Sequence, residues 1–133
     1  MYLSVHEKYC KHADYALLGK VVSVKDPKEM NCFSCKIYSV VVQEVFKGRH
    51  LVRANRRSRK VSLYTAGNSA MCGVDLMVGK QYFITGDVSD KKLHMNLCTS
   101  ALIPEPEAFD YANQARDPSY CRKADPEPNP QPL

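Results

Sequence analysis

The sequence predicts a single, mainly β domain: a small closed or partly open barrel of five strands, with a short helix before it and another after it. Three observations lead there. The 133 residues, 44% of them hydrophobic, suffice for one domain with its own core. Five short runs rich in apolar and β-branched residues alternate with turn-forming residues, as in small barrels. Helical patterns occur only near the two ends of the chain.

The first expected element is a helix over residues 5–12. Ser4 and Glu7 have the spacing of a capping box, in which each side chain satisfies a free backbone N–H at the helix start. Residues 15–24 then predict a strand that is partly buried on both faces, because apolar residues run through it almost without alternation. Gly19 within this run indicates a bend or bulge.

Four further strands and a second helix follow. Residues 36–46 and 60–65 are strand-like, and residues 81–85 and 92–97 predict a hairpin joined by the turn-rich residues 86–91. Cys72 and Cys98 bound this hairpin, so we expect it to be tied at its base. A helix over residues 104–115 is predicted from acids in its first turn and from the apolar residues Phe109, Tyr111 and Ala112.

We expect the domain to occupy residues 1–121. The last stretch, residues 122–133, has four prolines and little apolar content, which predicts a disordered tail. No run approaches the roughly 18 apolar residues of a membrane span, so no membrane partner is expected. The start, Met1 to Ser4 followed by charged residues, does not have the pattern of a signal peptide.

Six cysteines, an even number, suit three disulfides and an oxidising compartment. The prediction is therefore a mature secreted, extracellular protein. The alternative is a reduced intracellular protein with six buried thiols.

No motif in the chain predicts catalysis, a cofactor or a bound metal. Cys32 and Cys35 have the spacing of redox and zinc motifs, but a redox pair needs a helix start and zinc needs about four ligands. We expect a structural disulfide there. The histidines have no metal-binding or catalytic spacing, and there is no glycine-rich phosphate loop; they are His6, His12, His50 and His94.

The net charge of +5 comes from one loop, residues 47–60, which holds seven basic residues and no acid. Clustered arginines can pair with sulfate oxygens, so a sulfated glycosaminoglycan is a candidate ligand, and a solvated loop is the alternative. Nucleic acid is not an expected partner, although Tyr38, Tyr64 and Tyr82 lie on strands, because the cysteines indicate the wrong compartment. The candidate residues are Lys47, Arg49, Arg53, Arg56, Arg57, Arg59 and Lys60.

Several motifs resemble one known family. They are Cys10-Lys11-His12-Ala13-Asp14, Val45-Phe46-Lys47-Gly48, Ser69-Ala70-Met71-Cys72-Gly73, Gln81-Tyr82-Phe83-Ile84-Thr85-Gly86 and His94-Met95-Asn96-Leu97-Cys98. With elements in this order, the chain resembles the netrin-like module shared by netrin C-terminal domains and the inhibitory domain of tissue inhibitors of metalloproteinases. The resemblance runs from about Cys10 to Cys121 and implies a five-stranded barrel of the oligosaccharide/oligonucleotide-binding (OB) type with flanking helices.

The resemblance also implies a disulfide between Cys10 and Cys121. In the family, the counterparts of Cys72 and Cys98 bond to two N-terminal cysteines, but this sequence has no cysteine before Cys10 and has Cys32 and Cys35 in addition. Our first hypothesis is a direct Cys72–Cys98 bond with a local Cys32–Cys35 bond. Crosswise bonds from Cys32 and Cys35 to Cys72 and Cys98 are the alternative.

The same departure shapes the functional hypothesis. Family inhibitors begin with Cys-X-Cys, and the first residue's amino group and carbonyl chelate the protease zinc, whereas this sequence begins differently. We therefore expect a secreted, non-enzymatic module that binds an extracellular protein. The alternatives are a true metalloprotease inhibitor and a glycosaminoglycan-binding matrix protein. The candidate protein-binding ridge comprises Met1, Tyr2, Leu3, Ser4, Ser69, Ala70 and Met71.

Overall fold

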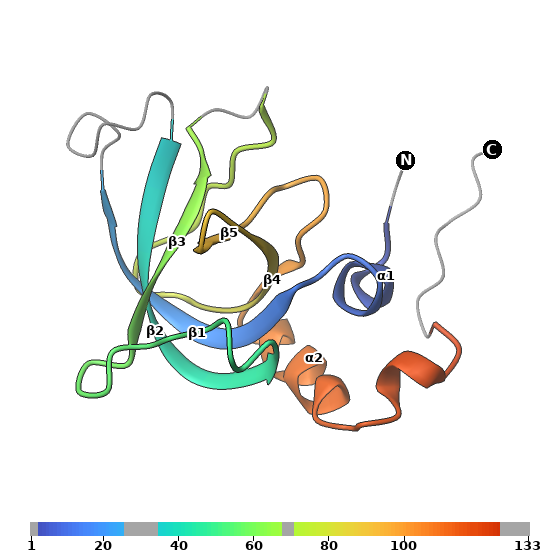
Figure 1. Cartoon of the computed structure of the whole chain (residues 1–133). Helices are drawn as coiled ribbons and strands as arrows, with labels where there is room; N and C mark the ends of the chain where they lie inside the picture. Colours follow the sequence, from blue (N-terminus) through green and yellow to red (C-terminus); the bar gives the residue numbers. More distant parts are fainter. Residues whose placement is uncertain (1–2, 26–34, 68–70, 126–133) are drawn as a thin grey trace.

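The computed structural model describes residues 3–25, 35–67 and 71–125 (Figure 1). Its centre is a closed barrel of five strands: β1 (Tyr15–Lys25), β2 (Cys35–Lys47), β3 (Lys60–Ala66), β5 (Lys92–His94) and β4 (Gln81–Ser89), neighbours in that order. The pairing of β4 with β1 closes it. Only β3 and β5 run parallel; the other pairs in the barrel are antiparallel. The predicted mainly β barrel with flanking helices is confirmed.

Strand β1 has a core on each of its faces. Tyr15, Leu17 and Val21 point into the barrel, whereas Ala16 and Leu18 pack under the helices. Because successive residues of a strand face opposite sides, burial on both faces explains the nearly continuous apolar run. The pairing of β1 with β2 shifts register between Leu18 and Gly19, where the sequence predicts a bulge.

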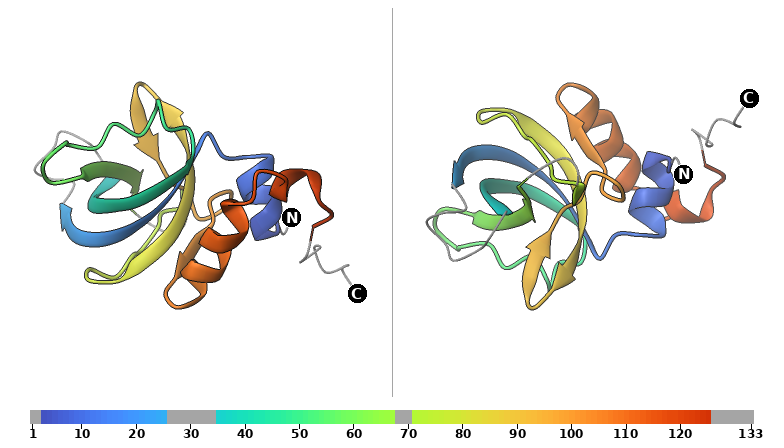
Figure 2. Two further views of the ribbon diagram at one scale, coloured as in Figure 1. Left: turned by 90° about the horizontal axis from the view of Figure 1, so that it is seen from below. Right: turned by 90° about the horizontal axis from the view of Figure 1, so that it is seen from above.

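The helices lie together on one side of the barrel (Figure 2). Helix α1 (Val5–Cys10) starts at Ser4, whose Oγ accepts the backbone N–H of Glu7. It is shorter than the predicted 5–12 helix, because the chain leaves it to join the barrel, where the Asp14 N–H donates to the Gly86 carbonyl. No helix in the described part of the chain is long and apolar enough to cross a membrane.

The predicted strand 92–97 is only half formed. The chain turns away from β4 at Met95, whose side chain is buried and whose N–H donates to the Tyr64 carbonyl. Part of the β4 edge is therefore not paired with β5. There, residues Tyr82 to Ile84 pair with a further strand, β6 (Leu102–Pro104), which the sequence analysis did not predict.

Because Pro104 belongs to β6, helix α2 (Glu107–Ala115) begins later than predicted. It packs through small side chains rather than through the predicted Phe109, which is 40% exposed; the buried positions are Ala108, Ala112 and Ala115. Arg116 then pairs with Glu44 on β2 at 2.8 Å, and this hydrogen bond lowers the pKa of Glu44.

The C-terminal segment folds back onto α1. A short 3-10 helix, η3 (Tyr120–Arg122), carries Cys121, which is bonded to Cys10 as the family resemblance implied. This bond joins residues 111 positions apart, and chain entropy for such a loop corresponds to about 4–5 kcal/mol. Asp125 still contacts Ser4, so packing extends past Cys121. Residues 122–125 of the expected disordered tail therefore belong to the described structure, and residues 126–133 lie outside it.

We predict that Gly86→Ala destabilises the barrel. A Cβ there would lie 2.0 Å from the His94 carbonyl oxygen and 2.5 Å from the Tyr15 hydroxyl, which itself donates to that carbonyl at 3.0 Å. Overpacking of this kind costs about 1–3 kcal/mol, and losing the buried hydrogen bond adds to it. Urea unfolding with the disulfides intact measures the effect, with the exposed Ser89→Ala as control; equal midpoints for both variants would contradict the prediction.

Candidate functional site

The Cys72–Cys98 bond lies at the end of the barrel where β3 and β5 terminate. Because these strands are parallel, pairing Leu63 with Leu93 and Tyr64 with His94, both chains leave the barrel at the same end. Their extensions remain hydrogen-bonded, since the Leu97 N–H donates to the Cys72 carbonyl at 2.9 Å. The two cysteines then form a disulfide with a Cα–Cα distance of 5.8 Å. Parallel pairing thus brings together two residues that are 26 positions apart.

The segment after Cys72 is fastened to the barrel by buried side chains. The Tyr38 hydroxyl donates to the Val74 carbonyl at 3.2 Å and accepts the Leu76 N–H at 3.0 Å. Thr65 Oγ1 accepts the Val74 N–H at 2.9 Å. At the surface, Asp75 pairs with Lys36, and this hydrogen bond raises the pKa of the lysine. The disulfide-bonded end is therefore a fixed part of the barrel.

The observed bonds decide between the two cysteine hypotheses. The direct Cys72–Cys98 bond is present, so crosswise bonds from Cys32 and Cys35 to these two residues are excluded. Cys35 is itself disulfide-bonded, while Cys32 lies outside the described residues. Because both sulfurs at this end are bonded to each other, neither can hold an N-terminal segment.

Exposed apolar side chains flank this bond. Met71 is 63% exposed and Leu97 is 53% exposed. Ser4, by contrast, is buried at the start of α1, where it contacts Glu7 and Asp125, and Leu3 precedes it in that helix-capping segment. Of the expected ridge, the structure thus places Met71 beside the disulfide and Ser4 at the α1 start. Met1, Tyr2, Ser69 and Ala70 lie outside the described residues.

The expected basic patch divides into two groups. Lys47 and Arg59 are held by backbone: Lys47 Nζ donates to the Tyr9 carbonyl at 2.9 Å, and Arg59 Nε donates to the Val42 carbonyl at 3.0 Å. Burial lowers the pKa of Lys47, while nearby Asp14 opposes that shift. Arg59 is nonetheless exposed, as are the other basic residues of the loop: Arg49, Arg53, Arg56, Arg57 and Lys60.

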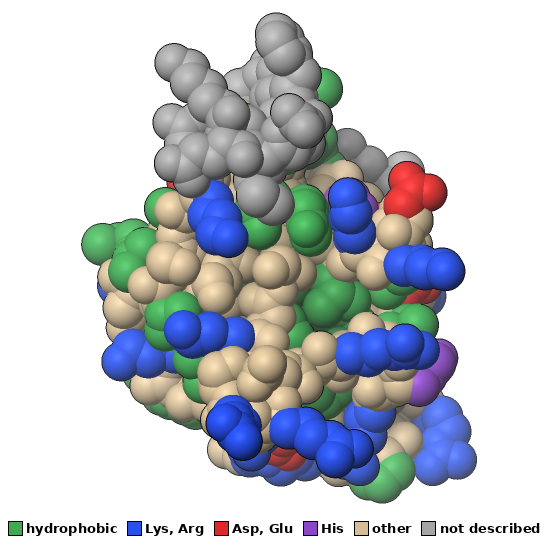
Figure 3. Space-filling view, turned by 60° about the vertical axis from the view of Figure 1, so that its left-hand side comes forward, with side chains coloured by type: hydrophobic (Ala, Val, Ile, Leu, Met, Phe, Trp, Pro, Cys, Tyr) green, Lys and Arg blue, Asp and Glu red, His purple; other side chains and the backbone are tan. Residues whose placement is uncertain are grey.

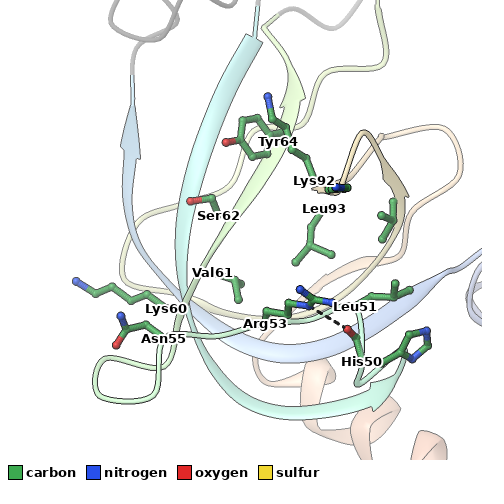
Figure 4. Close-up of a pocket in the computed structure, with 12 residues that line it drawn as sticks. His50, Leu51, Arg53, Asn55, Lys60, Val61, Ser62, Tyr64, Lys92 and Leu93 are labelled. Atoms are coloured by element: carbon green, nitrogen blue, oxygen red, sulfur yellow. Dashed lines mark hydrogen bonds between the residues drawn. The ribbon is translucent and has the colours of Figure 1, made fainter.

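A groove lies between part of this loop and the turn that connects β4 with β5. The sequence analysis did not predict this groove. Arg53 and Lys60 line it from the side of the loop and of β3, and Lys91 and Lys92 line it from the side of the turn. Arg53, Lys60 and Lys92 are labelled in Figure 4. His50 lies at its lower end in Figure 4. A sequence signal existed, because Lys91 ends the predicted hairpin turn and Lys92 begins the predicted strand that follows it. That these lysines lie near the basic loop was not predictable without the β3–β5 pairing.

All four histidines lie in the described part of the chain. His6 is buried and its Nε2 lies 3.0 Å from the Tyr120 carbonyl, while His94 Nε2 lies 3.3 Å from the Ser89 carbonyl. His12 and His50 are exposed. Within residues 3–25, 35–67 and 71–125, no group of three or more His, Cys, Asp or Glu could hold a metal ion.

Comparisons with known proteins point to one family. The family model described as "Tissue inhibitor of metalloproteinase" matches residues 4–102. The curated protein Metalloproteinase inhibitor 3 of Xenopus laevis is 31% identical over 93 residues, which is 69% of this chain and 40% of that protein. The chain therefore spans about two fifths of the length of this curated relative.

We predict that Tyr38→Phe loosens the segment after Cys72. Without the hydroxyl, the Val74 carbonyl and the Leu76 N–H lose their partner, and an unsatisfied buried group costs about 1–3 kcal/mol. Amide hydrogen exchange at Leu76 should accelerate by at least about tenfold. Tyr64→Phe, at a half-buried position outside this network, is the control. Unchanged exchange at Leu76 in Tyr38→Phe would show that the hydroxyl does not fix the segment.

Proposed function

Because the chain belongs to the tissue inhibitor of metalloproteinase family, we propose that it is a secreted, non-enzymatic module that binds an extracellular protein without chelating a catalytic zinc. We assign this role to one domain over residues 1–121. Disulfide bonds support an extracellular location, because they persist in oxidising compartments. The family relationship supports an inhibitor-related binding module.

The Cys72–Cys98 bond carries the proposal. In the family inhibitors, the counterparts of these residues hold two N-terminal cysteines and so place a free amino group on the protease zinc. Here the two sulfurs are bonded to each other. Whatever residues precede α1, no disulfide to this end of the barrel can place them in a protease cleft. Ordering an untethered segment costs about 1–2 kcal/mol for each residue fixed.

Protein binding without zinc is supported by the surface beside the bond. Met71 and Leu97 are exposed apolar side chains on a backbone that hydrogen bonds and the disulfide hold in place. Rigid apolar anchors favour binding because little conformational entropy is lost when they are buried. We place the protein-binding surface here and include Met1, Tyr2, Leu3, Ser4, Ser69 and Ala70 as candidates at its edge.

Metalloprotease inhibition is the second candidate function. One observation favours it: the Xenopus laevis relative is by its name a metalloproteinase inhibitor. This chain covers only 40% of that relative. The two functions differ in whether a free α-amino group is needed, and this difference can be measured.

We predict that this protein, added at micromolar concentration, leaves the rate of peptide hydrolysis by several metalloproteinase catalytic domains unchanged. The reason is that no disulfide tethers an amino group near the Cys72–Cys98 bond. An N-terminal inhibitory domain that begins with Cys-X-Cys serves as the positive control. Tight inhibition that disappears after acetylation of the α-amino group would contradict the proposal, because it would demonstrate chelation.

We also predict that the double variant Met71→Ser/Leu97→Ser retains less of the partner protein than the wild type does. Immobilised protein would be exposed to extracellular fluid, and the retained proteins would be quantified by mass spectrometry. Removing two apolar anchors should lower retention of the specific partner by about tenfold or more. Phe109→Ser on α2, where the side chain is 40% exposed, is the matched control. Equal retention by the wild type and both variants would remove this surface from the proposal.

A further inference from the structure

The barrel has an opening between β3 and β5. The two strands pair over only two residue pairs, Leu63 with Leu93 and Tyr64 with His94, so they separate on the side of Lys60 and Val61. A groove of about 760 Å³ occupies this opening, between β3, the loop around residues 50–55 and the β4–β5 turn (Figure 4). It lies at the opposite end of the β3–β5 pair from the Cys72–Cys98 bond.

The groove combines a basic rim with an apolar floor. Arg53, Lys60, Lys91 and Lys92 are exposed around it, and the residues that line it in the described chain include no Asp or Glu. Val61 and Leu93, each 7% exposed, belong to the barrel core beneath. Figure 3 shows Lys and Arg side chains around an apolar hollow on this face. Such a surface favours a ligand that carries several negative charges on a body with apolar faces.

Local structure orders both cationic sides of the groove. Asn55 Oδ1 accepts the N–H groups of Arg57 and Ser58, and the Asn55 N–H donates to the Lys60 carbonyl. On the other side, Asp90 and Lys91 have φ values of 52° and 62°, which make the tight turn that presents the lysines. Lys92 Nζ lies 5.1 Å from the centre of the Tyr64 ring. The charges are therefore held on fixed backbone.

We propose that this groove binds a sulfated saccharide chain. A sulfated saccharide carries anionic groups on successive rings, and its C–H faces can pack on Val61, Leu93 and the Tyr64 edge. An extended acidic peptide fits less well, because alternate side chains face opposite ways and only one acid per roughly 7 Å would face the groove. The site differs from the basic loop alone: it requires Lys91 and Lys92, and it does not use Lys47 or Arg59. It is independent of the protein-binding surface at Met71 and Leu97.

Two charge-matched variants test the site. Lys91→Asn/Lys92→Gln removes two charges from the groove, and asparagine tolerates the positive φ at position 91. Arg56→Gln/Arg57→Gln removes two charges from the exposed tip of the loop, outside the groove lining. Calorimetric titration with a heparin-derived octasaccharide at physiological ionic strength gives the affinity. The groove variant should bind at least about tenfold more weakly than the wild type, and the tip variant less than about threefold more weakly.

Chemically altered probes test the ligand class. De-sulfated octasaccharide should not bind, and an acidic peptide of equal charge should bind more weakly than the sulfated octasaccharide. Methyl resonances of Val61 and Leu93 should shift on titration with the sulfated probe. The proposal is overturned if the wild type does not bind, if both variants lose affinity equally, which would indicate nonspecific attraction, or if the acidic peptide binds more tightly.

Discussion

The parallel pairing of β3 with β5 is the constraint on which the rest of the structure depends. It links the β1–β2–β3 part of the barrel to the β4–β5 hairpin, and the β4–β1 pairing then closes the ring of five strands. It also sends the two following segments out at one end, where Cys72 and Cys98 bond. Because the pairing covers only two residue pairs, it leaves the opposite end open as a groove. A single short strand contact thus creates both candidate binding surfaces, one apolar and one basic.

In our proposal, the disulfide at the barrel end separates the fold from the best-known activity of the family. In family inhibitors the same two positions serve as anchors for the N-terminus, so fold and inhibition depend on the same cysteines. In this chain, the bond joins the two extensions of neighbouring strands and stiffens the barrel end. Tyr38 and Thr65 complete that rigid surface from beneath. The barrel therefore retains its shape while the chemistry at its end changes.

The sequence predicted the barrel because its signals are local or periodic: the Ser4 cap, the two-sided apolar run of β1, and the turn before β5. It failed where tertiary competition decided the outcome. Residues 95–97 are strand-like, yet burial of Met95 and its bond to Tyr64 draw them away from β4, and β6 takes that edge. The groove was likewise hidden, because Arg53 and Lys92 become neighbours only through a nonlocal strand pair. The basic charge itself was visible in the sequence.

The connectivity of the cysteines tests the central claim most directly. The unreduced protein would be digested at a pH that prevents disulfide exchange, and the linked peptides would be identified by mass spectrometry before and after reduction. The account predicts a peptide pair joined through Cys72 and Cys98, alongside one joined through Cys10 and Cys121. A peptide in which Cys72 or Cys98 is linked to any other cysteine would contradict it.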